Sequence, residues 1–185
     1  MSFSYDLIGI CGFARTGKDS LARFFESLLS SSNQRCKITS FAYYLKKDID
    51  DFLQSRLGIS AFTEDPTEKE IIRPLLVCWG TEIIRNKIDT DYWIRKMHNV
   101  RAVHRSQGTK TIIPDVRFAN EVEWIHSRGG PTVYIEREGV GPINPDEENH
   151  TKKLKKMCKF SFYWDNLKDF EHTGHTLVKD FLNDK

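Results

Sequence analysis

Short apolar runs alternate with stretches of helical periodicity along this chain. Residues 5–11 (YDLIGIC) form an apolar run followed by glycine, which predicts a buried central strand. Further runs predict strands at 36–41, 109–115, 131–136 and 160–164. Leucine and phenylalanine recur at helical spacing after residue 20 and again near residue 180, which predicts a first and a closing helix. This alternation is typical of an α/β protein built on a parallel sheet.

The stretch from residue 45 to residue 105 is mainly of helical periodicity, which predicts a helical insertion on the sheet. Because proline has no N–H group, Pro74 is expected in the first turn of a helix. Asp91 is expected to cap the helix that follows it. Residues 139–159 are polar, with glycine and proline at the start and lysine at the end, and we expect this segment to be mobile.

The amino-acid composition argues against several classes of binding site and of protein. The 185 residues include 28 Lys+Arg and 26 Asp+Glu, so the net charge of +2 gives no global reason to expect a nucleic-acid partner. The four cysteines form no CxxC pair, which argues against a zinc site or a disulfide framework and favours reduced thiols in the cytoplasm. No signal peptide or apolar membrane span is expected.

Residues 12–18 (GFARTGK) fit the pattern G-x-x-x-x-G-K between a strand and a helix. Small residues let successive backbone N–H groups surround a phosphate, and the lysine reaches its outer oxygens. The alternative is a turn with a surface lysine, but the flanking strand and helix favour a nucleotide site. The predicted ATP-binding residues are Gly12, Phe13, Ala14, Arg15, Thr16, Gly17, Lys18, Asp19 and Ser20. We call residues 12–18 the phosphate loop.

Asp19 stands where most such loops have serine or threonine, and Ser20 follows it. A carboxylate there can hold Mg²⁺ or a water of its shell, because magnesium prefers hard oxygen ligands. The alternative is that Asp19 only favours the positive end of the helix dipole. We favour metal contact.

The sequence resembles the bacteriophage deoxynucleoside monophosphate kinase family over residues 5–170. The resemblance is carried by GKDS in the loop, by RPLLVCWGTEIIRNKIDTDYW at 73–93 and by IPDVRFANEVEWIHSRGG at 113–130. It implies a P-loop NTPase-type, five-stranded parallel sheet, with a core at 1–44, 106–137 and 160–185. It also implies a helical NMP-binding insertion at 45–105 and a lid at 138–159.

The activity implied is transfer of the γ-phosphoryl group of Mg-ATP to a deoxynucleoside monophosphate, by a phage-encoded enzyme in the host cytoplasm. The acceptor oxygen is already anionic, so catalysis should come from positioning and charge neutralisation. Asp115, at the end of the third strand, is expected to hold the metal together with Asp19, although a loop cap is an equal structural alternative. Arg117 and Arg137 are expected at the phosphates; for Arg117 the alternative is a surface salt bridge.

The acceptor is expected to contact a set of residues that lie mostly in the helical insertion: Arg73, Gly80, Thr81, Glu82, Arg85, Trp93 and Glu121. Arg73 and Arg85 are twelve residues apart, which in a continuous α-helix places them on roughly one face. Gly80 has helix packing as its alternative, and tryptophans at helical spacing are more often core than base-stacking groups. Asn120 and Glu123 are interpreted as a capping box, which leaves Glu121 to face the site.

Several points depart from the family pattern or stay open. The lid sequence Asn149-His150-Thr151 leads into the lysine-rich run 152–156. We interpret this run as a solvated helix face, in preference to a contact with phosphate or nucleic acid. Asn166 is expected on the adenine side. The rival functions are a kinase for another small acceptor such as dephospho-coenzyme A, and a non-catalytic nucleotide-binding module. Oligomeric state is open, with a homodimer as one option, and so is the choice of base.

Overall fold

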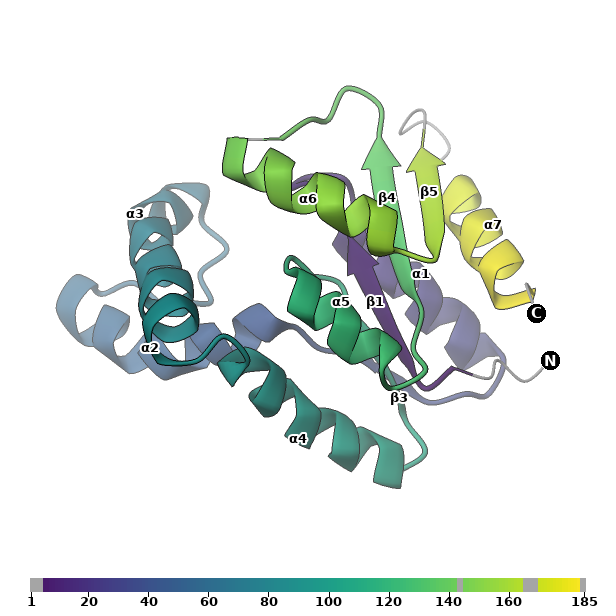
Figure 1. Ribbon diagram of the computed structural model, residues 1–185, viewed down its shortest axis with the longest axis horizontal. Helices are drawn as coiled ribbons and strands as arrows, with labels where there is room; N and C mark the ends of the chain where they lie inside the picture. Colours follow the sequence, from purple (N-terminus) through teal and green to yellow (C-terminus); the bar gives the residue numbers. More distant parts are fainter. Residues whose placement is uncertain (1–4, 143–144, 165–169, 184–185) are drawn as a thin grey trace. The chain divides into compact units, whose positions relative to one another are not determined.

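The computed structural model describes residues 5–142, 145–164 and 170–183 (Figure 1). Its sheet has five parallel strands in the order β2-β3-β1-β4-β5, which confirms the predicted fold class. The strands are β1 (Leu7–Cys11), β2 (Cys36–Ile38), β3 (Lys110–Ile113), β4 (Thr132–Arg137) and β5 (Phe160–Trp164). In the described parts of the chain, no helix is long and apolar enough to span a membrane.

The central strand β1 is buried along its whole length between β3 and β4. Its side chains alternate between the two faces of the sheet. Ile8 and Ile10 join the core beneath α1 (Lys18–Ser31) and α7 (Phe170–Asn183), two helices that also contact each other. Phe25 and Phe181 meet edge to face in this layer, with ring centroids 5.1 Å apart.

The other face of the sheet carries α5 (Ala119–His126) and α6 (Pro145–Met157), which contact each other and strands β1 and β4. Gly9 lets α5 approach closely, since a Cβ there would lie 2.5 Å from Cδ1 of Ile125. Most of the segment 139–159 forms α6, and its mobility stays a prediction. Thr151 and Leu154 are buried one turn apart and attach this polar helix to the fold.

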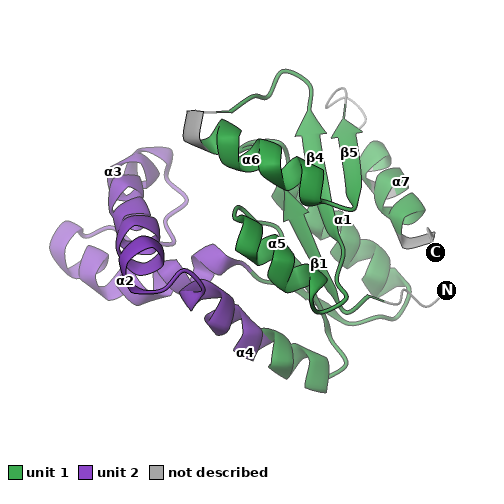
Figure 2. Ribbon diagram, in the orientation of Figure 1, with its two compact units in different colours: residues 1–39, 101–185 green, residues 40–100 purple. Residues whose placement is uncertain are grey.

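Residues 40–100 form a second compact unit, and the other described residues form the first (Figure 2). The second unit contains α2 (Phe41–Leu57), α3 (Pro66–Val77), the π-helix η1 (Cys78–Ile88) and the part of α4 (Tyr92–Ser106) up to Val100. Its small core comprises Ile49, Leu53, Ala61 and Ile72. The acceptor-binding role expected for residues 45–105 stays a prediction.

The expected position of Pro74 was wrong, because this residue lies inside α3 and not in its first turn. The helix begins eight residues earlier, at Pro66. There Asp65 caps it, with Oδ1 accepting hydrogen bonds from the N–H groups of Thr67 and Glu68 at 2.9 and 3.0 Å. Proline is tolerated at that first position, whereas Pro74 removes a donor from the helix interior. The hydrogen-bonding pattern changes four residues later, where η1 begins.

Candidate active site

The phosphate loop joins the carboxyl end of β1 to the start of α1, as the sequence predicts. Three of its residues have positive φ, namely Gly12 at 148°, Arg15 at 66° and Gly17 at 91°. A Cβ on Gly12 would lie 2.5 Å from the carbonyl oxygen of Ile135, so the tight turn requires glycine there. The hydroxyl of buried Thr16 donates to the carbonyl of Phe13 at 2.8 Å, which closes the loop on itself.

Lys18 bends back over the loop. Its Nζ donates to the carbonyl oxygens of Gly12 and Phe13, at 2.9 and 2.5 Å. Burial, and then repulsion from the guanidinium of Arg117, lowers the pKa of Lys18 from 10.5 to about 8. The ammonium is therefore held by two neutral acceptors that an anionic ligand can replace.

A carboxylate contacts the same loop. The backbone N–H of Ala14 donates to Oε1 of Glu147, in the first turns of α6, at 3.0 Å. The negative charge of Glu147 also acts to raise the pKa of Lys18, against the larger effects of burial and Arg117. The loop thus already presents one backbone N–H to an anionic oxygen, which is what phosphate binding requires.

Two further side chains contact the loop from neighbouring strands. Nε1 of the buried Trp164, at the end of β5, donates to the carbonyl of Thr16 at 2.7 Å. Nη1 of Arg137, at the end of β4, donates to the carbonyl of Arg15 at 3.4 Å. Arg137 was predicted for this site, whereas Trp164 and Glu147 were not. Trp164 does lie at a strand's carboxyl end, and that position was the available signal.

Asp115 and Arg117 follow β3, the strand next to β1. The register pairs Gly9 with Ile113, and the N–H of Val116 donates to the carbonyl of Ile10 at 3.2 Å. Half-buried Asp115 and exposed Arg117 therefore leave the sheet at the edge where the phosphate loop begins. Because Arg117 acts on the pKa of Lys18, these two cations share one electrostatic environment.

The capping pair expected for α5 was wrong. Helix α5 begins at Ala119, so its third residue is Glu121, and neither Asn120 nor Glu123 takes that place. Oε2 of Glu121, which is 2% exposed, accepts from the backbone N–H groups of Arg117 and Phe118 at 2.8 and 3.1 Å. Glu121 thus fixes the backbone that carries Arg117, and a direct contact of Glu121 with the acceptor stays a prediction.

Several residues predicted to bind the acceptor contact one another inside the second unit. Nε1 of Trp93 donates to the carbonyl of Gly80 at 3.0 Å, and the Trp93 side chain is almost fully buried. A Cβ on Gly80 would lie 2.7 Å from Cδ2 of Leu45, so helix packing explains this glycine. Arg85 is buried, and its Nη1 donates to the carbonyl of Thr90 at 3.1 Å.

The α-helical spacing used to place Arg73 and Arg85 on one face does not apply, because residues 78–88 form a π-helix. The change of period is visible where the N–H of Asp89 bonds the carbonyl of Ile84, five residues earlier, at 2.7 Å. Arg73 is exposed and Arg85 is buried. Thr81 is half-buried and Glu82 is exposed, and their predicted ligand contacts stay predictions.

The structure therefore gathers the phosphate loop, Lys18, Arg117 and Arg137 at the carboxyl ends of β1, β3 and β4, with Asp115 following β3 at this edge. Asp19 is exposed in the first turn of α1, and Ser20 after it is half-buried. Asn166 lies outside the described residues. Among the described residues, no group of three or more His, Cys, Asp or Glu is arranged to hold a metal ion.

The fold matches known kinases. The dephospho-CoA kinase of Campylobacter jejuni is 10% identical, with a TM-score of 0.57 over 96% of this chain and 98% of that chain. An APS kinase from Mycobacterium tuberculosis is 13% identical, with a TM-score of 0.48 over 97% of this chain and 98% of that chain. No curated protein matches this sequence.

A family model described as deoxynucleotide monophosphate kinase matches residues 27–154, more than half of the chain. The match begins after the phosphate loop, so the loop geometry and the family match are separate observations. Both indicate phosphoryl transfer. The chain belongs to the deoxynucleotide monophosphate kinase family and is a phosphotransferase with a P-loop kinase fold.

Proposed function

We propose that this kinase uses Mg-ATP as its donor and that the phosphate loop holds the β- and γ-phosphates of ATP. The observation that carries this proposal is the loop itself, where an N–H already binds a carboxylate and Lys18 rests on two carbonyls. A phosphate oxygen is a stronger acceptor for Lys18 than the two neutral carbonyls, because it is charged, and at the N–H of Ala14 it would replace one anionic acceptor by another. The N-terminal end of α1 adds positive potential for the phosphate.

Phosphoryl transfer between two nucleotides needs no general base here, since the acceptor phosphate oxygen is already anionic. The main obstacle is bringing two anions together. Lys18, Arg117 and Arg137 would neutralise this charge, with arginine gripping phosphate in two places. Glu121 contributes indirectly, because it holds the backbone N–H groups of Arg117 and Phe118.

Asp115 and Asp19 are the residues we propose for the magnesium ion, and the donor set fits this metal. Mg²⁺ is usually bound by one or two carboxylates together with waters and substrate phosphates, and not by a complete protein cage. The ion, when bound, would neutralise the donor phosphates.

We assign the deoxynucleoside monophosphate to the second unit, where Arg73, Thr81 and Glu82 have side chains at least partly accessible. Gly80, Trp93 and Arg85 would support this surface from within, given their buried contacts. Residues 138–159, which include α6, would act as the lid that excludes water from the donor phosphates.

The decisive experiment measures ADP release from Mg-ATP with dAMP, dGMP, dCMP, dTMP and dephospho-coenzyme A as separate acceptors. We expect turnover with at least one deoxynucleoside monophosphate and none with dephospho-coenzyme A, whose kinase shares the fold. Turnover with dephospho-coenzyme A alone would reassign the acceptor. Binding of ATP without turnover of any acceptor would identify a non-catalytic nucleotide-binding module and contradict the proposal.

A further inference from the structure

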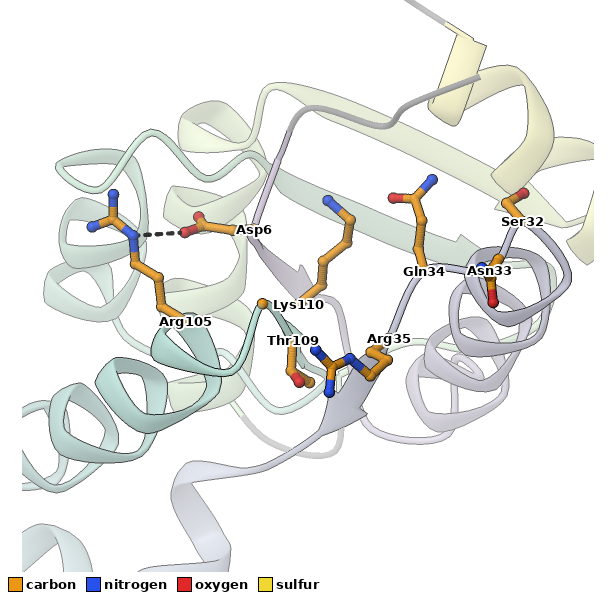
Figure 3. Close-up of a pocket in the computed structure, with 9 residues that line it drawn as sticks. Asp6, Ser32, Asn33, Gln34, Arg35, Arg105, Thr109 and Lys110 are labelled. Carbon is orange, nitrogen blue, oxygen red and sulfur yellow. Dashed lines mark ion pairs between the residues drawn. The ribbon is translucent and has the colours of Figure 1, made fainter.

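A second cationic site lies at the opposite ends of the strands, where β1 and β3 begin. A pocket of about 520 Å³ is lined by Tyr5, Asp6, Arg101, Arg105, Ser127 and Arg128. A neighbouring pocket of about 610 Å³ shares Asp6 and Arg105 and adds Arg35 and Lys110 (Figure 3). We call the two together the amino-end pocket. All of its residues belong to the first unit.

Charge is concentrated in the amino-end pocket. Among the residues that the structure describes, five cationic side chains and one carboxylate, Asp6, line it, which leaves an excess of four positive charges. The whole chain has a net charge of only +2, so this edge is more positive than the protein as a whole. Such an excess in a concave surface attracts small anions.

The one carboxylate is already paired. Nη2 of Arg101 lies 3.0 and 3.1 Å from the two oxygens of Asp6, and Nε of Arg105 lies 3.4 Å from Oδ2. Figure 3 shows the side chains of Arg105 and Asp6 pointing toward each other at the pocket, with their ion pair as a dashed line. Asp6 therefore neutralises part of the positive charge of Arg101 and Arg105. Because its own charge is offset in this way, Asp6 repels an incoming anion less than an isolated carboxylate would.

Arg101 has unused hydrogen-bonding capacity. Its side chain is more than nine-tenths buried, and its Nε has no hydrogen-bond acceptor among the described residues. A buried donor without a partner is unfavourable, so an acceptor beside it would stabilise it. The charge of Arg101, after burial, lowers the pKa of Arg128, which shows that the two guanidiniums repel each other across this pocket.

The shape of the site favours a small ligand over a nucleic acid. The cations line two pockets of about 520 and 610 Å³, volumes in the range of small-molecule sites, and Arg101 among them is buried. A phosphate group is small enough to enter and has oxygens for several guanidiniums at once. We propose that the amino-end pocket binds a phosphate-bearing small molecule, either a free polyphosphate or the phosphates of a nucleotide, at a site separate from the phosphate loop.

This site is distinct from the donor site in position as well as in construction. Asp6 directly precedes β1 and Gly12 directly follows it, so six residue steps along this strand separate them by roughly 20 Å. An anion in the amino-end pocket would therefore not compete with ATP for the phosphate loop. The inference does not depend on the proposed function.

The test is equilibrium dialysis of the full chain with radiolabelled pyrophosphate, which fits both sites. We expect two sites in the unaltered protein, one in Lys18→Ala and one in the double variant Arg105→Gln/Arg128→Gln. Arg23→Gln, which removes an exposed arginine of α1 outside the pocket, should retain both. A non-hydrolysable ATP analogue in excess should block only the site that Lys18→Ala removes.

Arg101→Lys refines the test, because lysine keeps the charge beside Asp6 but lacks the Nε–H. We expect at least a several-fold weaker pyrophosphate affinity at the amino-end site with the thermal midpoint close to that of the unaltered protein. Competition by inorganic triphosphate and by deoxynucleoside triphosphates would distinguish the two sources of phosphate. Tighter competition by a short DNA duplex than by either would overturn the small-molecule assignment.

The inference fails if the double variant binds as much pyrophosphate as the unaltered protein, or if Lys18→Ala abolishes all binding. If Lys18→Ala changes nothing while the double variant loses its site, the amino-end pocket stands and the proposed donor site fails. The two conclusions are therefore separable.

Discussion

The phosphate loop of the first unit and the stretch 73–93 of the second both contain family motifs, but their polar groups have different partners. In the loop, Lys18 donates to two carbonyls and the N–H of Ala14 donates to a carboxylate, and a ligand can displace all three acceptors. In the second unit, Trp93 bonds the carbonyl of Gly80 within the protein interior. A motif residue can therefore serve a ligand directly or shape the surface on which a ligand rests.

This difference has an energetic consequence. Partners in the loop are exchanged when a ligand binds, so removing a loop side chain should reduce activity more than stability. Partners in the second unit are not exchanged, so removing one leaves a buried group unsatisfied and should reduce stability first. Four predictions follow from the largest expected effect to the smallest.

Lys18→Ala should reduce kcat/KM for ATP by about 10²–10³-fold, the loss typical when one group that stabilises the transition-state charge is removed. Stability should change little or rise, because the ammonium is partly buried among neutral carbonyls. Steady-state kinetics and urea unfolding measure the two effects. Arg23→Gln, on the exposed face of α1, is the matched control and should leave both unchanged. Full activity of Lys18→Ala would contradict the assignment of the donor site.

Trp93→Phe should show the opposite balance. The carbonyl of Gly80 loses its 3.0 Å bond, so the free energy of unfolding should fall by about 1–3 kcal/mol. The KM for the deoxynucleoside monophosphate should stay within about twofold, because the ring is buried. Trp79→Phe is a matched control, since the Nε1 of Trp79 has no acceptor in the described part of the chain. A raised KM with unchanged stability would instead support base stacking by Trp93.

The pH dependence of activity tests Lys18 without changing it. The pKa of Lys18 is lowered to about 8, so above pH 8 the free enzyme loses its ammonium, and kcat/KM for ATP should fall about tenfold per pH unit. Between pH 8 and the unfolded value of 10.5 the unfolded chain binds more protons, so the free energy of unfolding should rise with pH. The arginine of Lys18→Arg stays charged, so the residual activity of this variant should not fall above pH 8. A flat profile in the unaltered enzyme would exclude Lys18 as the titrating group.

The loop and the strand positions could be predicted because their signals are local, whereas the order of the strands in the sheet was not predicted. Gly12 and Gly17 occupy positions where the backbone needs positive φ, and β1 is a continuous apolar run. Lys18, Asp115, Arg117 and Arg137 lie at or beyond strand ends, where a parallel sheet places ligand groups.

Other features depend on contacts that sequence spacing does not contain. The capping role of Glu121 follows from a helix that begins two residues earlier than expected. The π-helix at 78–88 changes the period on which face assignments depend, and no residue pattern announced it. Segment 139–159 is polar, yet most of it forms α6, in which Thr151 and Leu154 are buried.

The contact between Glu147 and the loop also joins residues far apart in the chain, 133 positions away from each other. Its carboxylate binds the N–H of Ala14, which in the proposed complex would face a donor phosphate. ATP must therefore displace this carboxylate, and the charge of Glu147 adds repulsion while the lid stays near the loop.

Glu147→Gln removes the charge and keeps an oxygen acceptor. We expect ATP affinity to rise about fivefold, which corresponds to the roughly 1 kcal/mol by which a hydrogen bond to a charged acceptor exceeds one to a neutral acceptor. Titration of a fluorescent ATP analogue measures the change. Glu148→Gln is the matched control, because Glu148 pairs with Lys152 at 2.5 Å on the helix surface and should leave affinity unchanged. Weaker ATP binding by Glu147→Gln would mean that the carboxylate helps to bind the donor. In that case, the carbonyls bonded to Lys18 would be the only partners in the loop that the ligand displaces, and the difference between the loop and the second unit would rest on them alone.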